Sequence, residues 1–176
     1  GANWIFSDST SGGRVGVEVA CTSGEVDGVR LPKEAYYVTA AMFRDDPQVH
    51  LIGHWSYPVG TKKTIYVASN GDTVELFLNG QSLGHGKISN RYLFTFADIA
   101  FVPGELKAVA SRAGQVIATA TEHTVGAPVA LRLTPLVGPG GVIADGADVA
   151  LFDVEAVDAK GDRVPTFQQK EDFDFT

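Results

Sequence analysis

Hydrophobic and polar residues alternate with a period of two through most of the chain beyond residue 48, as in strands with one buried face. The clearest case is NGDTVELFLNGQSLG, residues 70–84, in which every second residue from Val74 to Leu78 is aliphatic. Asn-Gly pairs at 70–71 and 79–80 flank this run, and Asn-Gly supplies the positive φ angles of tight turns. We therefore expect a β-hairpin whose return strand begins at Ser82 and Leu83.

Further short strands with turn signals between them are predicted at 50–55, 64–68, 92–96, 106–110 and 115–121. Ala113-Gly114 joins the last two as a hairpin, and Pro103-Gly104 forms the turn before them. Strands of this length and spacing indicate an antiparallel β-sandwich of the immunoglobulin-like class. The predicted fold is therefore mainly β.

One segment has a helical period instead. Pro32 suits a first helical turn, and Glu34 places negative charge at the positive end of the helix. Apolar residues then follow at spacings of three and four, namely Ala35, Val38, Ala41 and Met42, until the polar run at 44–47. A short apolar strand at 3–6 precedes this helix. Residues 1–46 are thus predicted to be the last strand and helix of an α/β domain that lies mostly upstream.

The last fifty residues begin another β pattern after the linker Gly126-Ala127-Pro128. Strands are predicted at 129–133 and 152–156, and turns at 139–141 and 158–162. These are too few strands to close a sandwich of about 100 residues. The expected organisation is a barrel remnant at 1–46, a sandwich at 47–125 and a partial immunoglobulin-like domain at 126–176. Because the chain starts without Met and stops inside an alternating run, we expect a segment of a longer polypeptide.

Composition narrows the classes of function. Apolar residues make up 44% of the chain, which indicates a folded core. The net charge of −7 argues against nucleic acid or an anionic membrane as the main partner. No apolar run approaches the roughly 20 residues that span a bilayer. The single cysteine, Cys21, excludes an internal disulfide and a multi-cysteine zinc site.

Paired carboxylates and histidines are the first candidates for chemistry. Glycoside hydrolysis uses two carboxylates about 5 to 9 Å apart. None of the amino-terminal carboxylates follows an obvious buried strand with a second one facing it, so a loop or helix-end role is favoured for Glu18, Glu25, Asp27 and Glu34. His50 and His54 would lie on one face of a strand but about 13 Å apart. No third ligand is near them in the sequence, so neither a metal nor a cofactor is expected.

Aromatic residues are the second candidates, because aromatic rings stack on the apolar C–H faces of sugars. A core position is favoured for Trp55, Tyr36 and Tyr37. Trp4 differs because it lies where a strand enters a loop, which is the ligand-binding edge of a parallel α/β barrel.

Several stretches together resemble one family. WIFSD, GEVDGVRLPKEAYY, DDPQVHLIGHW, SNGDTVELFLNGQSLG and FTFADIAFVPGELKAVA are similar, in this order, to the carboxy-terminal part of family 2 glycoside hydrolases of the β-galactosidase type. The segment ADGADVALFDVEAVDAKGDRVPT resembles the bacterial immunoglobulin-like domain that often follows. The run ELFLNGQSLG together with the PKEAYY helix is the more specific part of this resemblance.

The resemblance implies a retaining exo-glycosidase whose catalytic (β/α)8 barrel contributes its eighth strand and helix through residues 1–46. Its two catalytic Glu residues would lie upstream of Gly1, so no catalytic residue is assigned here. Trp4 matches a tryptophan that lines the sugar subsite, and the partner would be a β-linked saccharide. Within this family, the resemblance favours a β-galactosidase. A periplasmic or extracellular location is favoured for the enzyme. A homo-oligomer is left open.

Two hypotheses follow. In the first, the chain is the structural, accessory end of such a glycosidase and has no activity when isolated. In the alternative, it is a non-catalytic carbohydrate-binding or surface-adhesion module with Trp55 and Tyr57 as an exposed platform. An immunoglobulin-like spacer without a ligand shares the same fold.

Overall fold

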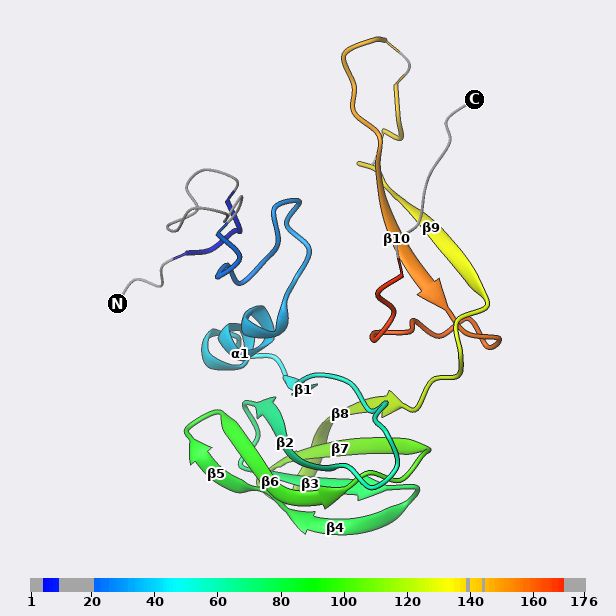
Figure 1. Cartoon of the computed structure of the whole chain (residues 1–176). Helices are drawn as coiled ribbons and strands as arrows, with labels where there is room; N and C mark the ends of the chain where they lie inside the picture. Colours follow the sequence, from blue (N-terminus) through cyan, green and yellow to red (C-terminus); the bar gives the residue numbers. More distant parts are fainter. Residues whose placement is uncertain (1–4, 10–20, 139, 144, 170–176) are drawn as a thin grey trace. The chain divides into compact units, whose positions relative to one another are not determined.

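The computed structural model describes residues 5–9, 21–138, 140–143 and 145–169. The chain divides into two compact units, Gly1–His123 and Thr124–Thr176. In the described residues the first unit contains helix α1 and strands β1 to β8, and the second contains strands β9 and β10 (Figure 1).

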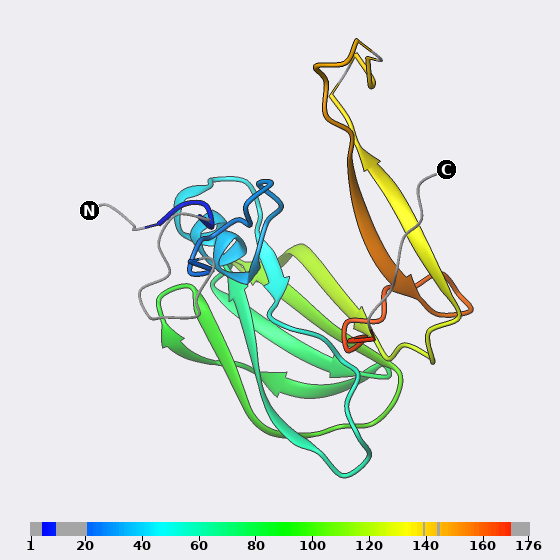
Figure 2. The same cartoon turned by 45° about the horizontal axis from the view of Figure 1, so that its top comes forward.

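The first unit is built around two four-stranded antiparallel sheets that lie over one another (Figures 1 and 2). One sheet has the order β1-β2-β6-β5, with β1 (Val49–Leu51), β2 (Lys62–Ser69), β6 (Leu93–Ala100) and β5 (Lys87–Asn90). The other has the order β4-β3-β7-β8, with β4 (Gln81–His85), β3 (Thr73–Leu78), β7 (Glu105–Arg112) and β8 (Gln115–His123). The predicted immunoglobulin-like sandwich is confirmed.

The core lies between these two sheets and takes alternate residues from each strand. Val74 and Leu76 of β3 are fully buried, and Glu75 between them is not. The other members of the core are Leu51, Trp55, Ile65, Val67, Phe94, Phe96, Phe101, Leu106, Ala108 and Ala110. The period of two in the sequence therefore identifies the inward face of the central strands correctly.

The β3–β4 hairpin has the predicted turn, because Asn79 and Gly80 adopt φ angles of 51° and 81°. The same prediction is wrong for Asn70-Gly71, where neither residue has a positive φ. Gly71 is instead required by a close approach, since a Cβ atom there would lie 2.9 Å from the carbonyl oxygen of Ser111. The side chain of Asn70 forms hydrogen bonds with the backbone of residues 44–48, the segment that follows α1.

Helix α1 (Glu34–Phe43) is present where the sequence predicts it. Its buried side is only partly the predicted one, because Ala40 and Ala41 are buried whereas Ala35 and Met42 are exposed. Residues 3 and 4 of the predicted strand at 3–6 lie outside the described residues. Just after it, Ser7 forms a parallel bridge with Val26. The assignment of residues 1–46 to a barrel stays a prediction.

The predicted strand 50–55 is shorter in the structure, where β1 ends at Leu51. Gly53 follows with a φ of 95°, a backbone conformation that a continuing strand does not have. His54 therefore lies beyond the strand.

The second unit is an antiparallel pair, β9 (Ala130–Leu136) and β10 (Leu151–Val157), which confirms both strands predicted there. Apolar side chains of this pair are exposed, including Leu133 and Phe152, each with 52% of its surface accessible. A two-stranded sheet does not cover its own apolar face.

Asp158 organises the turn that follows β10. Its side chain is buried, and its carboxylate accepts hydrogen bonds from the backbone N–H groups of Gly126 (2.8 Å), Lys160 (2.9 Å) and Asp162 (3.0 Å). The bond from Gly126 is the main cause that lowers the pKa of this carboxyl, against the opposing effect of burial.

Replacing Asp158 by asparagine is expected to destabilise the second unit at neutral pH, because an amide accepts these N–H groups with only one oxygen and no charge. Since the pKa is lowered in the folded state, the stabilisation is present above the ordinary carboxyl value of 3.8 and is lost as the pH falls below it. Amide hydrogen exchange at Gly126, Lys160 and Asp162 measures this effect. A difference between the two proteins that does not shrink on acidification would contradict the role of the charge.

Candidate functional site

Two of the candidate residues lie outside the described part of the chain, namely Trp4 and Glu18. The sugar-subsite role of Trp4 therefore stays a prediction.

The other amino-terminal carboxylates have structural contacts. Asp27 accepts hydrogen bonds through Oδ1 from the backbone N–H groups of Val29 (2.9 Å) and Leu31 (2.8 Å), which shapes the turn before α1. Glu25 is buried, with 6% of its surface accessible, and its backbone carbonyl accepts a hydrogen bond from Lys33. A solvated loop position, as expected from the sequence, is therefore wrong for Glu25.

Glu34 belongs to a small cluster that joins α1 to β1. Nε2 of His50 lies 2.6 Å from Oε2 of Glu34, and the backbone N–H of Gly53 donates to Oε1 at 3.2 Å. The ring of Tyr37 stacks on the imidazole of His50 with 3.9 Å between centroids. Partial burial acts to raise the pKa of Glu34, but the hydrogen bond and charge of His50 and the Gly53 N–H outweigh it, so this pKa is lowered.

Glu122 of β8 lies near the same cluster and has the opposite shift. Burial raises the pKa of Glu122, and the negative charge of Glu34 adds to this effect, while His50 and His123 oppose it. Carboxyl groups whose pKa values are pushed apart are the pattern of an acid/base pair. Here, however, Glu34 is already bonded to His50 and Gly53, so the contacts fit an anchor between helix and sandwich. Sequence reasoning missed Glu122 because only the fold brings it near residues 34 and 50.

The second histidine, His54, belongs to an aromatic group instead. Its ring stacks on Tyr57 with 4.5 Å between centroids, and its Nδ1 accepts the backbone N–H of Ser56. Burial is the main cause that lowers the pKa of His54, and the nearby charge of Lys63 acts in the same direction. Among the described residues, no group of three His, Cys, Asp or Glu side chains could hold a metal ion.

Trp55 is part of the core, as the sequence favours. It has no accessible surface, and its Nε1 donates to the carbonyl oxygen of Val102 at 3.0 Å. The ring of Tyr57 is half-buried against Trp55 and Phe101. The exposed platform assumed in the adhesion alternative is therefore wrong for Trp55.

Exposed apolar residues gather at α1. Met42 and Phe43 expose 46% and 77% of their surface, and Phe6 exposes 59%. Phe6, Tyr36 and Phe43 line a hollow of about 330 Å³ beside the helix. We call Phe6, Tyr36 and Phe43 the α1 apolar surface. Large contiguous apolar surfaces mark places where another part of a protein docks. None of the helices in the described part of the chain has the length and apolar character needed to cross a membrane.

Comparison with known proteins gives a consistent result. Residues 60–118 match a family described as "Domain of unknown function (DUF4982)". The chain is 51% identical over 174 residues to a β-glucuronidase of Formosa agariphila, and 34% identical over 143 residues to β-galactosidase BoGH2A of Bacteroides ovatus. These matches cover 98% and 81% of this chain but only 18% and 17% of the relatives.

Solved structures agree with the sequence matches. A β-glucuronidase from glycoside hydrolase family 2 superposes on 93% of this chain with a TM-score of 0.87 and 52% identity, and the match covers 17% of that protein. A family 2 member from Bacteroides cellulosilyticus superposes on 81% of the chain with a TM-score of 0.72 and 28% identity, over 22% of its own length.

Proposed function

Because this chain belongs to glycoside hydrolase family 2, we propose that it forms the carboxy-terminal part of a retaining exo-glycosidase and has a structural role there. The observation that carries the proposal is the match along 98% of the chain to 18% of a much longer β-glucuronidase. The domain assignment proposed with it is a barrel remnant at 1–46, a sandwich at 47–125 and a partial immunoglobulin-like domain at 126–176.

The α1 apolar surface supports this role. Exposed phenylalanine side chains are stabilised when another element covers them. In the proposed enzyme the remaining barrel helices and strands cover Phe43 and Phe6. The exposed apolar residues of β9 and β10 have the same explanation, with further strands completing the sandwich.

The substrate proposed is a terminal β-linked glycoside. The sequence favours a β-galactosidase, and BoGH2A carries that name at 34% identity. The relative with 51% identity is called a β-glucuronidase. We therefore place β-glucuronides first and β-galactosides second as substrates to test. Within the full enzyme, Trp4 is proposed to line the sugar subsite.

The test compares the 176-residue chain with the complete product of its gene, using aryl β-glucuronides and aryl β-galactosides. We expect turnover from the complete product only, because no catalytic residue is assigned within the chain. In the complete product, Trp4→Ala is expected to weaken substrate use, whereas Phe152→Ala in the second unit is not. Turnover by the isolated chain that is lost in Glu18→Gln or Glu25→Gln would overturn the proposal.

A further inference from the structure

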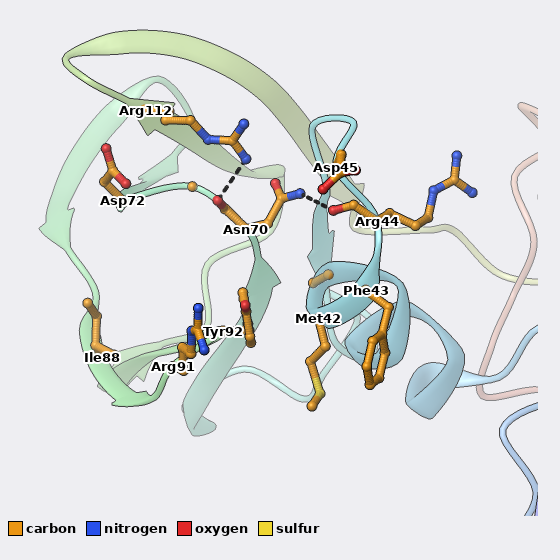
Figure 3. Close-up of a pocket in the computed structure, with 12 residues that line it drawn as sticks. Met42, Phe43, Arg44, Asp45, Asn70, Asp72, Ile88, Arg91, Tyr92 and Arg112 are labelled. Atoms are coloured by element: carbon orange, nitrogen blue, oxygen red, sulfur yellow. Dashed lines mark hydrogen bonds between the residues drawn. The ribbon is translucent and has the colours of Figure 1, made fainter. Parts of the chain in front are cut away.

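We propose that the first unit carries a saccharide site that binds a sugar bearing a carboxylate. The site is a cavity of about 540 Å³ between the end of α1 and three turns of the sandwich. Figure 3 shows Arg112 and Asp72 on one side of it, Arg91 and Tyr92 on another, and Met42 and Phe43 from the helix on a third. The inference does not rest on the proposed function.

Three arginines line this cavity, and Arg44 is already paired with Asp46, so Arg91 and Arg112 are the two that concern a ligand anion. The guanidinium carbon of Arg91 lies 5.1 Å from the centre of the Tyr92 ring. Nη2 of Arg112 donates to the backbone carbonyl of Asn70 at 3.0 Å. In the described part of the chain, the ion pairs of arginine involve Arg44, Arg132 and Arg163, and neither Arg91 nor Arg112 has a carboxylate partner.

Unpaired arginines are notable in a chain with 21 acidic and 14 basic residues. A guanidinium has five N–H donors in a planar fork, and the fork matches the two oxygens of a carboxylate. Arg112 uses one donor on Asn70, and the guanidinium of Arg91 makes no hydrogen bond to the described residues. Both side chains are exposed and retain donors for a ligand anion.

The rest of the lining suits a sugar ring rather than a bare anion. Met42 and Ile88 expose 46% and 54% of their surface, so an apolar face is available. Asp72 receives the backbone N–H of Ala113 on Oδ2, which leaves Oδ1 as an acceptor for a hydroxyl group. A ring with an apolar face, several hydroxyl groups and one carboxylate matches this combination.

Phosphate is the competing anion, and the acidic residues argue against it. Asp72 and Asp45 line the same cavity as the two arginines, so their charges offset the arginine charges. A dianion would meet two nearby carboxylates, whereas a uronic acid brings one negative charge and hydroxyl donors that the aspartates can accept. The geometry therefore points to a uronic acid residue.

The experiment titrates the ¹⁵N-labelled 176-residue chain with methyl β-D-glucuronide and, separately, with methyl β-D-glucoside, which lacks only the carboxylate. We expect saturable shifts of the backbone amides of Asp72, Arg91, Tyr92 and Arg112 with the glucuronide and much weaker binding of the glucoside. Loss of a hydrogen bond to a charged group corresponds to about a tenfold weaker Kd, so Arg91→Gln is expected to weaken binding by that factor. Arg91→Lys should have an intermediate effect, because it keeps the charge but not the fork.

Lys63→Gln is the matched control. The amino group of Lys63 lies 5.0 Å from the centre of the Tyr57 ring, an arrangement like that of Arg91 over Tyr92 but outside the cavity. Lys63→Gln should leave the Kd for methyl β-D-glucuronide unchanged. Equal binding of glucuronide and glucoside, tighter binding of inorganic phosphate, an unaltered Kd in Arg91→Gln, or the absence of saturable shifts would each overturn the proposal. None of these outcomes bears on hydrolysis, so failure here is distinct from failure of the proposed function.

Discussion

Trp55→Ala is expected to lower the free energy of unfolding of the first unit by about 3–5 kcal/mol. The indole is fully buried, and its ring centre lies 5.2 Å from that of Phe101 and 6.1 Å from that of Tyr57. Truncation would remove these contacts and leave a cavity between the two sheets. It would also remove the hydrogen bond that the indole N–H donates to the carbonyl oxygen of Val102. Urea denaturation followed by far-ultraviolet circular dichroism measures the change.

Phe43→Ala provides the matched control for this large effect. It also truncates an aromatic side chain to alanine, but 77% of Phe43 is exposed in this chain. Phe43→Ala is expected to lower the free energy of unfolding by less than about 0.5 kcal/mol. Similar costs for the two variants would show that Trp55 is not the centre of the core.

Asn70→Ala is expected to lower the free energy of unfolding of the first unit by about 2 kcal/mol, because three hydrogen bonds are lost together. Oδ1 of Asn70 accepts the backbone N–H of Gln48 at 2.9 Å. Nδ2 donates to the carbonyl oxygens of Arg44 at 3.1 Å and Asp46 at 2.8 Å. One side chain therefore fastens the segment that leaves α1 to the β2–β3 turn. Thermal and urea unfolding measure the cost, and hydrogen exchange at Gln48 localises it.

Two further variants sharpen this prediction. Asn70→Asp keeps the acceptor for Gln48 but replaces the two donors by an oxygen that faces two carbonyl groups, so it should be at least as harmful as alanine. Asn90→Ala is the control, because among the described residues the Asn90 side chain has a single hydrogen bond, accepted from the N–H of the adjacent Arg91 at 2.8 Å. Equal effects at positions 70 and 90 would contradict a fastening role.

The part of the fold that the sequence predicts correctly is the part whose side chains alternate between core and solvent. Strands β2, β3, β6 and β7 bury every second residue over much of their length, and this periodicity is visible without coordinates. The sequence does not predict strand β5, because all four of its residues are exposed and KISN carries no alternation. The sequence also does not predict the conformation at Gly71, since its cause is the carbonyl group of Ser111, forty residues away.

Functional groupings were harder to predict than strands for a related reason. His50 and Glu34 are sixteen residues apart, and only the docking of α1 on β1 brings them together. The uronic acid site likewise combines a helix end with turns near residues 70, 91 and 112. In the sequence, the charged residues of these turns are far from one another. The sequence does not show which turns lie at the same end of the sandwich.

The burial of Trp55 also has a spectroscopic consequence. The chain contains two tryptophans, Trp4 and Trp55, so Trp4→Phe produces a protein with one indole fluorophore. That fluorophore is shielded from water and fixed by its bond to Val102. Its emission should therefore be blue-shifted in the native protein and should move to longer wavelength only when the sandwich opens. Such a protein would report the unfolding of the first unit alone, without signal from β9 and β10.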